Sequence, residues 1–253
     1  MSAPSLASDA LVLDCRDHGE ADIIVTLLSP QHGKVSALAK HAKKSKRRFV
    51  NKLEIFSFLH IINRNRPASG FALLQEADLL NGFINIRRSI PSYFAASVIR
   101  EVLLATIHEG ERDEELFKLT LWAFHMLDRG QPPQTVIALF LPRFFAVIGY
   151  RPEFGKCLSC NALVHASLRQ EFSIHAGSVL CPRCTSTTHH TVLNVSAGTI
   201  RFLQSTQNEP LERLHRLKAS GMILTEALAL LYRYGKHLLH RDIISWKMLS
   251  GFQ

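Results

Sequence analysis

Four of the five cysteines in the sequence lie in two Cys-x-x-Cys motifs, one at residues 157–160 and the other at 181–184. Each motif fits a tight turn that presents two thiolates to one ion, and two such turns complete a tetrahedral shell of sulfurs around Zn²⁺. In a cytosolic protein such paired motifs indicate a metal site rather than disulfides, because thiols there stay reduced. The sequence therefore predicts one structural zinc ion with these ligands: Cys157, Cys160, Cys181 and Cys184.

The pattern around these cysteines does not favour a catalytic zinc ion. A catalytic site keeps one coordination position open for water, and four thiolates leave none. The deaminase pattern H-x-E then P-C-x-x-C is not completed, because His18-Gly19-Glu20 lies far upstream and Pro182 follows Cys181 instead of preceding it. No His-Glu-x-x-His motif and no glycine-rich phosphate loop occurs. We therefore expect a chain that is not an enzyme, with zinc holding together a hairpin that lacks its own core.

The remaining residues with metal-binding side chains near the motifs are expected to play no part in the site. Cys15 stands alone in a predicted strand and is expected to be a small buried hydrophobic residue. Several histidines near the motifs are expected to be surface residues, because four thiolates already fill the shell: His165, His175, His189 and His190.

A second group of residues forms a basic run without any carboxylate: Lys34, Lys40, Lys43, Lys44, Lys46, Arg47, Arg48 and Lys52. Ser45 and Asn51 add groups that reach phosphates, and Phe49 offers a ring for base stacking. Grooves that bind single-stranded nucleic acid combine these features, so we predict that the run binds nucleic acid. Arg64 and Arg66 are expected to extend the same face. A loop that serves only solubility and a localisation signal are the alternatives.

The overall charge agrees with an anionic partner. The chain has 253 residues and a formal net charge of +9, which favours nucleic acid, an acidic peptide or an anionic membrane surface. A basic enzyme without such a partner remains the alternative. The most apolar stretch, residues 136–150, is interrupted by Pro142 and Arg143 and is too short for a bilayer. Residues 1–10 lack the pattern of a secretory signal, so we expect a cytoplasmic protein without a membrane segment.

The elements that position the basic run are predicted strands. Apolar alternation, β-branched runs and turn signals place them at residues 11–16, 23–28, 35–39, 53–62 and 71–76. Five short strands within about 80 residues suit a small closed barrel such as the OB-fold, with an SH3-like barrel as the alternative. The basic run joins two of these strands, where OB-folds place binding loops.

Helical spacing replaces strand alternation after Pro91. We predict helices at residues 95–107, 116–127, 136–148, 198–203 and 222–240, with Ser196 as an N-cap. The cysteine motifs lie in an insert between the third and fourth of these helices. The predicted fold is therefore α+β: an OB-fold domain at residues 1–80, then a helical domain at 81–253 with a four-cysteine zinc finger inserted at about 151–192.

Three segments of the sequence, spread over nearly the whole chain, resemble the RecO family of bacterial recombination mediators. The first runs from His18-Gly19-Glu20-Ala21-Asp22 to His32-Gly33-Lys34 and into the basic run. The second comprises Ile148-Gly149-Tyr150-Arg151-Pro152 and Ala176-Gly177-Ser178-Val179-Leu180, one before each cysteine motif. The third runs from Leu231-Tyr232-Arg233-Tyr234 to Ser245-Trp246-Lys247-Met248-Leu249. Two positions depart from the family, since His41 and Ala176 stand where it often has glycine.

The resemblance implies an N-terminal OB-fold, a helical domain and a zinc insert. It implies binding of single- and double-stranded DNA, annealing of complementary strands and help in loading the RecA recombinase, at the nucleoid during repair. The implied partners are RecR and the acidic C-terminal tail of single-strand-binding protein, and an apolar groove with a basic rim in the helical domain, near arginines such as Arg129 and Arg143, would suit that tail. A zinc-dependent enzyme and an RNA-binding OB-fold protein remain the alternatives.

Overall fold

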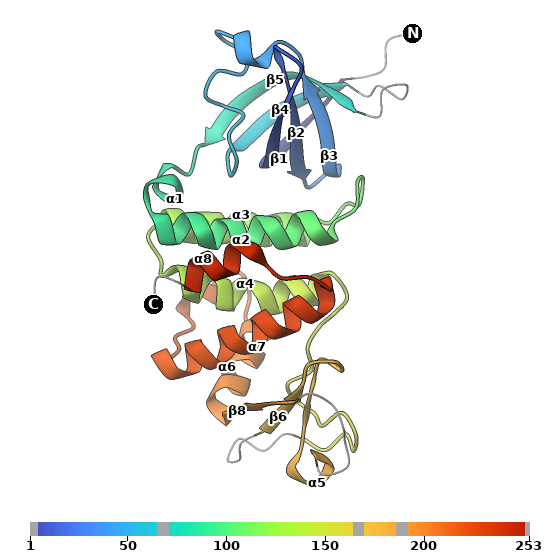
Figure 1. Ribbon diagram of the computed structural model, residues 1–253, viewed down its shortest axis with the longest axis vertical. Coiled ribbons are helices and arrows are strands. Elements are labelled where there is room, and N and C mark those ends of the chain that lie inside the picture. The colour runs from blue at the N-terminus through green and yellow to red at the C-terminus, as the bar shows by residue number, and fades with distance from the viewer. Residues whose placement is uncertain (1–4, 65–70, 164–169, 186–191, 251–253) are drawn as a thin grey trace.

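The chain is described by a computed structural model over residues 5–64, 71–163, 170–185 and 192–250. These residues form an elongated molecule in which a strand-rich part, a helical part and a small sheet follow one another along the long axis (Figure 1). The α+β class predicted from the sequence is confirmed. None of the helices in the described ranges has the length and apolar character needed to span a bilayer.

The N-terminal part is a five-stranded barrel of the OB-fold type. Its strands are β1 (Ser5–His18), β2 (Asp22–Ser29), β3 (Gly33–Ala39), β4 (Phe58–Arg64) and β5 (Ala72–Asn81). They are hydrogen-bonded in the order β1-β2-β3-β5-β4, and β4 pairs with β1 to close the ring. Only two residue pairs join β3 to β5, in parallel, so the ring is nearly open there. A small, partly open barrel of this size is the OB-fold architecture, which confirms that prediction.

The first strand is apolar on both faces because it separates two cores. Ala10 and Val12 lie inside the barrel, whereas Leu11 and Leu13 belong to the core that the barrel shares with the helices. Successive side chains of a strand point to opposite faces, so this run is buried from both sides.

Several predicted strand boundaries are wrong, because β1 begins earlier, at Ser5, and β5 ends later, at Asn81, than expected. The strand expected at residues 53–62 begins only at Phe58, and the preceding residues form turns. Leu53 is buried in the barrel core, but Phe56 has φ of 73° and its ring lies 5.4 Å from Tyr93 and 5.5 Å from Phe124 in the helical core. The segment before Phe58 contains apolar residues because they fill the junction between the two cores. Its pattern of apolar residues therefore resembles that of a strand.

The helical part is built around one buried helix. The helices are α1 (Ile84–Arg88), α2 (Ile90–Thr106), α3 (Glu114–Asp128), α4 (Pro133–Val147), α6 (Ala197–Asn208), α7 (Gly221–Leu239) and α8 (Ile244–Ser250). Helix α4 is buried at successive positions from Val136 to Leu141, as expected of a central helix. Side chains of Ser89, Asp113 and Ser196 cap α2, α3 and α6 by accepting backbone N–H groups, which confirms the predicted cap at Ser196.

Polar contacts fix the barrel against the helices. Arg100 of α2 donates to the carbonyl of Leu13 and pairs with Asp14. On the other side, the Gly110 N–H donates to the Lys34 carbonyl at 2.9 Å. Gly33 has φ of +66°, and a Cβ there would lie 2.0 Å from the carbonyl oxygen of Glu111, so only glycine permits this approach. The barrel is therefore held in one orientation.

The cysteine insert forms a small sheet at the far end of the molecule (Figure 1). Its elements are β6 (Gln170–Ser173), β7 (Ser178–Leu180), the short α5 (Pro182–Thr185) and β8 (Val192–Val195), with strand order β7-β6-β8. Phe172 is fully buried, and its ring lies 5.9 Å from that of Tyr234 on α7. Gly177 has φ of +63°, and a Cβ there would lie 2.6 Å from the Tyr234 hydroxyl. One face of the insert thus shares the helical core.

Candidate zinc centre and nucleic-acid interface

The basic run from Lys40 to Lys52 folds into a compact loop at the end of the barrel that lies away from the helices (Figure 1). A short 3-10 helix, η1 (Ala42–Lys44), is anchored by the Lys43 N–H, which donates to the Ala21 carbonyl at 3.0 Å. The His41 N–H donates to the Asp22 carboxylate at 2.7 Å, and His41 has φ of 56°. This left-handed conformation explains why glycine suits the position that His41 occupies.

The inner side of this loop closes the barrel. Ala42, Phe49 and Leu53 belong to the barrel core, and Phe49 is only 4% exposed. The prediction that the Phe49 ring stacks on a base is therefore wrong. The Arg48 guanidinium covers that ring from outside, 5.0 Å from its centroid. In the sequence, the charged neighbours of Phe49 suggest a surface residue. In the structure its ring fills the open end of the barrel core, where close packing requires an apolar side chain.

Two of the basic side chains bind the free edge of β5. Pairing between β3 and β5 ends at Leu73, so the following carbonyls of β5 have no strand partner on that side. The Lys52 ammonium donates to the Ala77 carbonyl at 2.6 Å, and Arg48 donates to the Gln75 carbonyl at 3.4 Å. These cations stabilise the loop against the strand edge, and this contact engages part of their hydrogen-bonding capacity.

Two further members of the run, Lys43 and Lys34, are engaged in contacts or lie elsewhere. Lys43 donates to the Gly19 carbonyl at 3.2 Å and pairs with Asp17 at 3.0 Å. Lys34 lies at the opposite end of β3, beside Gly110, so the structure does not bring it together with the other basic residues. Arg64 ends β4 opposite Leu73, at the loop's end of the barrel.

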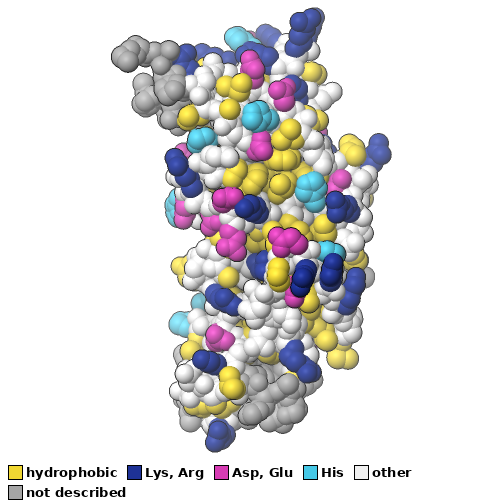
Figure 2. Space-filling model, turned by 180° about the vertical axis from the view of Figure 1, so that it is seen from behind, with side chains coloured by type: hydrophobic (Ala, Val, Ile, Leu, Met, Phe, Trp, Pro, Cys, Tyr) yellow, Lys and Arg dark blue, Asp and Glu magenta, His cyan; other side chains and the backbone are white. Residues whose placement is uncertain are grey.

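Four exposed cations remain, and they form what we call the basic ridge: Lys40, Lys44, Lys46 and Arg47. In the described part of the chain, no ion pair engages their side chains. Figure 2 shows Lys and Arg side chains gathered along this end of the molecule. Lys44, Lys46 and Arg47 also line a shallow hollow of about 340 Å³, together with His41, Ser45 and Arg48. Arg66, expected to extend this face, lies outside the described residues.

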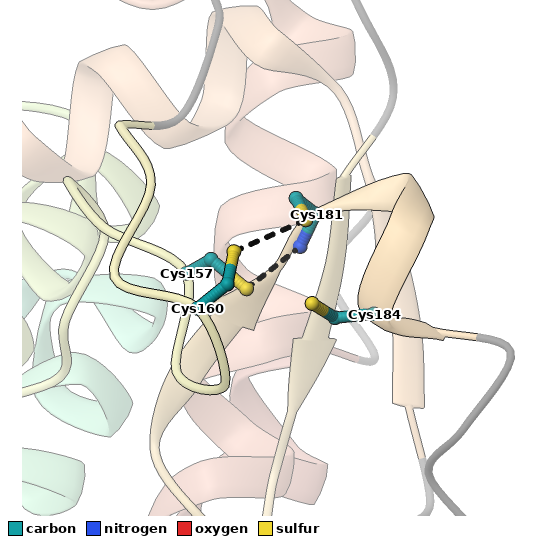
Figure 3. A group of neighbouring side chains, drawn as sticks. All are labelled: Cys157, Cys160, Cys181 and Cys184. Carbon is teal, nitrogen blue, oxygen red and sulfur yellow. Dashed lines mark hydrogen bonds between the residues drawn. The ribbon is translucent and has the colours of Figure 1, made fainter.

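The four predicted zinc ligands come together at the tip of the insert. Cys157 and Cys160 lie on a turn, Cys181 follows β7 and Cys184 lies on α5 (Figure 3). All four sulfurs lie within 4.8 Å of one another, and those of Cys160 and Cys181 are 3.7 Å apart. Tetrahedral zinc with bonds of about 2.3 Å requires sulfurs about 3.8 Å apart. The cluster therefore fits zinc, and among the described residues it is the one group of three or more side chains placed to hold a metal.

Backbone groups prepare the first motif for a metal. The Cys181 N–H donates to the Cys157 sulfur at 3.3 Å, and Asn161 adopts φ of 57°, which turns the chain after Cys160. Burial would raise the pKa of Cys157, but backbone N–H groups of Cys181, Cys160 and Ser159 outweigh it and lower the pKa to about 6. This thiol is therefore readily ionised, as a zinc ligand must be.

His175 and Cys15, the other candidate ligands within the described residues, lie outside the cysteine cluster. The ring of His175 lies 5.4 Å from that of His237, and His175 is not part of the cysteine cluster. The other histidines that we expected at the surface, at positions 165, 189 and 190, lie outside the described residues. Cys15 donates to the Leu53 carbonyl at 3.1 Å, and burial raises its pKa to about 12. It is a protonated thiol far from the metal centre.

An apolar pocket in the helical part was not located by sequence reasoning. It has a volume of about 230 Å³, and its apolar walls are Trp122, Met126, Val136, Leu139 and Leu217. His215 and Lys218 lie at its rim, on the segment that contains the 3-10 helix η2 (Leu214–Arg216). A signal for it exists, because leucines recur at every third position from 211 to 217, and the residues between them are exposed and polar or charged.

The arginines expected near such a groove have different roles. Arg129 is exposed, just before the pocket residue Gln131. Arg143 instead donates to the carbonyls of Thr206 and Glu209, so it fixes the end of α6. An apolar pocket with a basic rim can bind a short peptide that has both apolar and acidic residues.

Known proteins match nearly the whole chain. Residues 1–83 match the family model described as "Recombination protein O N terminal", and residues 87–247 match "Recombination protein O C terminal". Relatives named "DNA repair protein RecO" include one from Syntrophus aciditrophicus, 28% identical over 97% of this chain and 95% of the relative. One from Desulforamulus reducens is 30% identical over 93% and 90%, and one from Desulfatibacillum aliphaticivorans is 34% identical over 72% of each chain.

Proposed function

Because this chain belongs to the RecO family of DNA repair and recombination proteins, we propose that it binds single- and double-stranded DNA and does not alter the DNA chemically. In this proposal it anneals complementary strands and assists the loading of RecA onto DNA coated with single-strand-binding protein. It acts in the cytoplasm at the nucleoid, with RecR as a further partner. The observation that carries the proposal is the basic ridge on a folded loop of an OB-fold barrel.

The ridge suits phosphates rather than bases. Its side chains are cations on long stems, and the nearby aromatic ring of Phe49 is buried. Contacts to phosphates release counterions and carry little sequence information, so binding should depend strongly on salt and weakly on sequence. The loop is held by the contacts of Lys43, Arg48 and Lys52, and a preorganised surface loses less conformational entropy on binding.

The apolar pocket is the proposed site for the tail of single-strand-binding protein. Trp122 and Leu217 offer an apolar anchor, while Lys218 and His215 offer positive charge to carboxylates. Exposed Arg213 lies on the same segment. The pocket and the ridge lie on different parts of a molecule whose barrel is fixed to its helices by Arg100 and other contacts. Tail and DNA can therefore be bound at the same time.

The zinc ion is proposed to be structural. Four thiolates would complete its shell and leave no position for a substrate or water. The ion would hold the turn at Cys157 against α5, where the insert is farthest from the helical core. A zinc-dependent enzyme is disfavoured by this closed shell.

One assay tests the proposed activity. Complementary single strands are coated with single-strand-binding protein, the chain is added, and duplex formation is followed by fluorescence. We expect annealing to accelerate without nucleotide hydrolysis and without cleavage of either strand. No acceleration at low salt would refute the proposal, and equal affinity for structured RNA with no annealing would favour the RNA-binding alternative.

A further inference from the structure

The cysteine cluster has an exposed side and a shielded side. Cys160 is exposed, Cys181 and Cys184 are half-buried, and Cys157 is only 2% exposed. The sulfurs of Cys160 and Cys181 are 3.7 Å apart and belong to different motifs (Figure 3). A disulfide needs sulfurs about 2.05 Å apart, so an approach of under about 2 Å would join them. The accessible sulfurs thus lie close to a second sulfur that can react with them.

We propose that Cys160 and Cys181 form a redox modification site, at which a peroxide converts the two zinc-bound thiolates into a disulfide and releases the metal. This inference rests on the zinc centre proposed above and not on the DNA-binding ridge. The substrate class is hydrogen peroxide or an alkyl hydroperoxide, small molecules that reach an exposed sulfur without a pocket.

The chemistry balances with the peroxide as the only oxidant. The Cys160 thiolate attacks one peroxide oxygen, the O–O bond breaks, and the departing oxygen takes a proton to leave as water, giving a sulfenic acid. The Cys181 thiolate then attacks that sulfur, and the S–OH oxygen takes a second proton and leaves as water. The two thiolates together lose two electrons, and one hydrogen peroxide is reduced to two waters. An alkyl hydroperoxide is reduced to its alcohol and one water instead. Two ligands of the ion are lost, so zinc is released.

Release of the metal should affect the tip and leave the rest of the fold in place. The sheet of the insert is held by Phe172, which packs on Tyr234 and Phe154 in the helical core. The turn at Cys157 and the short α5 lie at the other end of that sheet. The basic ridge lies at the far end of the molecule (Figure 1), so DNA affinity should survive oxidation.

The chain contains its own control thiol. Cys15 is half-buried, donates to the Leu53 carbonyl, and has a pKa raised to about 12 by burial. A protonated thiol is a poor nucleophile, so the same peroxide treatment should leave it unmodified. Thiol reactivity should therefore differ sharply between the barrel and the tip of one protein.

The experiment uses the metal-loaded full chain treated with hydrogen peroxide. A chromogenic chelator measures released zinc, mass spectrometry of non-reduced peptides maps disulfides, and DNA affinity is measured in parallel. We expect about one zinc ion released per chain, a disulfide between Cys160 and Cys181, free Cys15 and unchanged DNA affinity. Reduction with a dithiol and addition of zinc should restore the original state. Cys15→Ser should release zinc at the same rate as the unaltered chain.

Four results would overturn the proposal. Zinc retained at peroxide levels that oxidise a free-thiol peptide would show that the cluster is protected. A disulfide confined to the two cysteines of one motif would refute the pairing. Oxidation of Cys15 as fast as that of Cys160 would show that exposure does not set reactivity. Protein that contains no zinc before treatment would refute the zinc centre itself, and unaltered DNA binding would then leave the proposed DNA-binding function standing.

Discussion

Removal of the basic ridge should abolish most of the salt dependence of DNA binding. The change replaces Lys40, Lys44, Lys46 and Arg47 by alanine. Each contact to a single-strand phosphate contributes about −0.7 to the slope of log affinity against log salt, so four contacts give about −3. With that slope, the unaltered chain should lose about 50-fold in affinity between about 50 and 200 mM salt, whereas the variant should change little.

The assay is a salt titration of fluorescence anisotropy with labelled oligonucleotides of different sequence. The matched control removes the same charge elsewhere, at the exposed Arg88, Arg201, Arg233 and Arg241. We expect the control to keep the slope of the unaltered chain, and the ridge variant to weaken binding equally for all sequences. The Tm of the ridge variant should stay unchanged, because its residues are exposed and unpaired.

A second variant tests how the loop is anchored to the barrel rather than how it binds DNA. Lys43, Arg48 and Lys52 donate to backbone carbonyls, so their replacement should cost about 1 kcal/mol of unfolding free energy per lost contact. An unchanged salt slope in the ridge variant would refute the assignment of DNA binding to the ridge, whatever the second variant does.

Three other predictions concern the zinc centre, the barrel plug and the pocket. Protein purified without chelator should contain about one zinc ion per chain, and elemental analysis showing no metal would contradict the zinc centre. Cys181→Ser should lower the Tm and the solubility of the protein without changing its DNA affinity. Phe49→Ala should lower the free energy of unfolding by about 3–5 kcal/mol in urea titrations, and a loss below about 1 kcal/mol would mean that the ring does not close the barrel. A labelled peptide copying the tail of single-strand-binding protein should bind with a Kd near 1 μM, about 8 kcal/mol. Leu217→Asp should weaken it at least about tenfold while Arg201→Ala leaves it unchanged, and equal binding by both variants would place the tail elsewhere.

Local spacing predicted the parts of the structure that local geometry determines. Two Cys-x-x-Cys turns suffice to define a four-sulfur cluster, and the structure brings those sulfurs within 4.8 Å. Helices α2, α3, α4, α6 and α7 follow from apolar periodicity and caps such as Ser196. The start of β1 was missed because Ser8 and its neighbours lack apolar alternation, although Ser8 is buried and bonded to Ser29.

Features set by tertiary contacts could not be predicted in this way. Lys34 lies in the same basic run as Lys40, but the seven residues of β3 span about 20 Å and carry it to the other end of the barrel. Phe49 stands among charged residues and still closes the core. The pocket at Trp122 is assembled from segments nearly a hundred residues apart, which no local pattern reveals.

Lysine footprinting shows whether DNA lies on the basic ridge. The chain is acetylated with and without a saturating single-stranded oligonucleotide, and modification of each lysine is quantified by mass spectrometry. We expect DNA to protect Lys40, Lys44 and Lys46, while Lys34 at the opposite end of β3 and Lys156 at the zinc tip remain equally reactive. Unprotected ridge lysines, with protection elsewhere in the chain, would contradict this expectation.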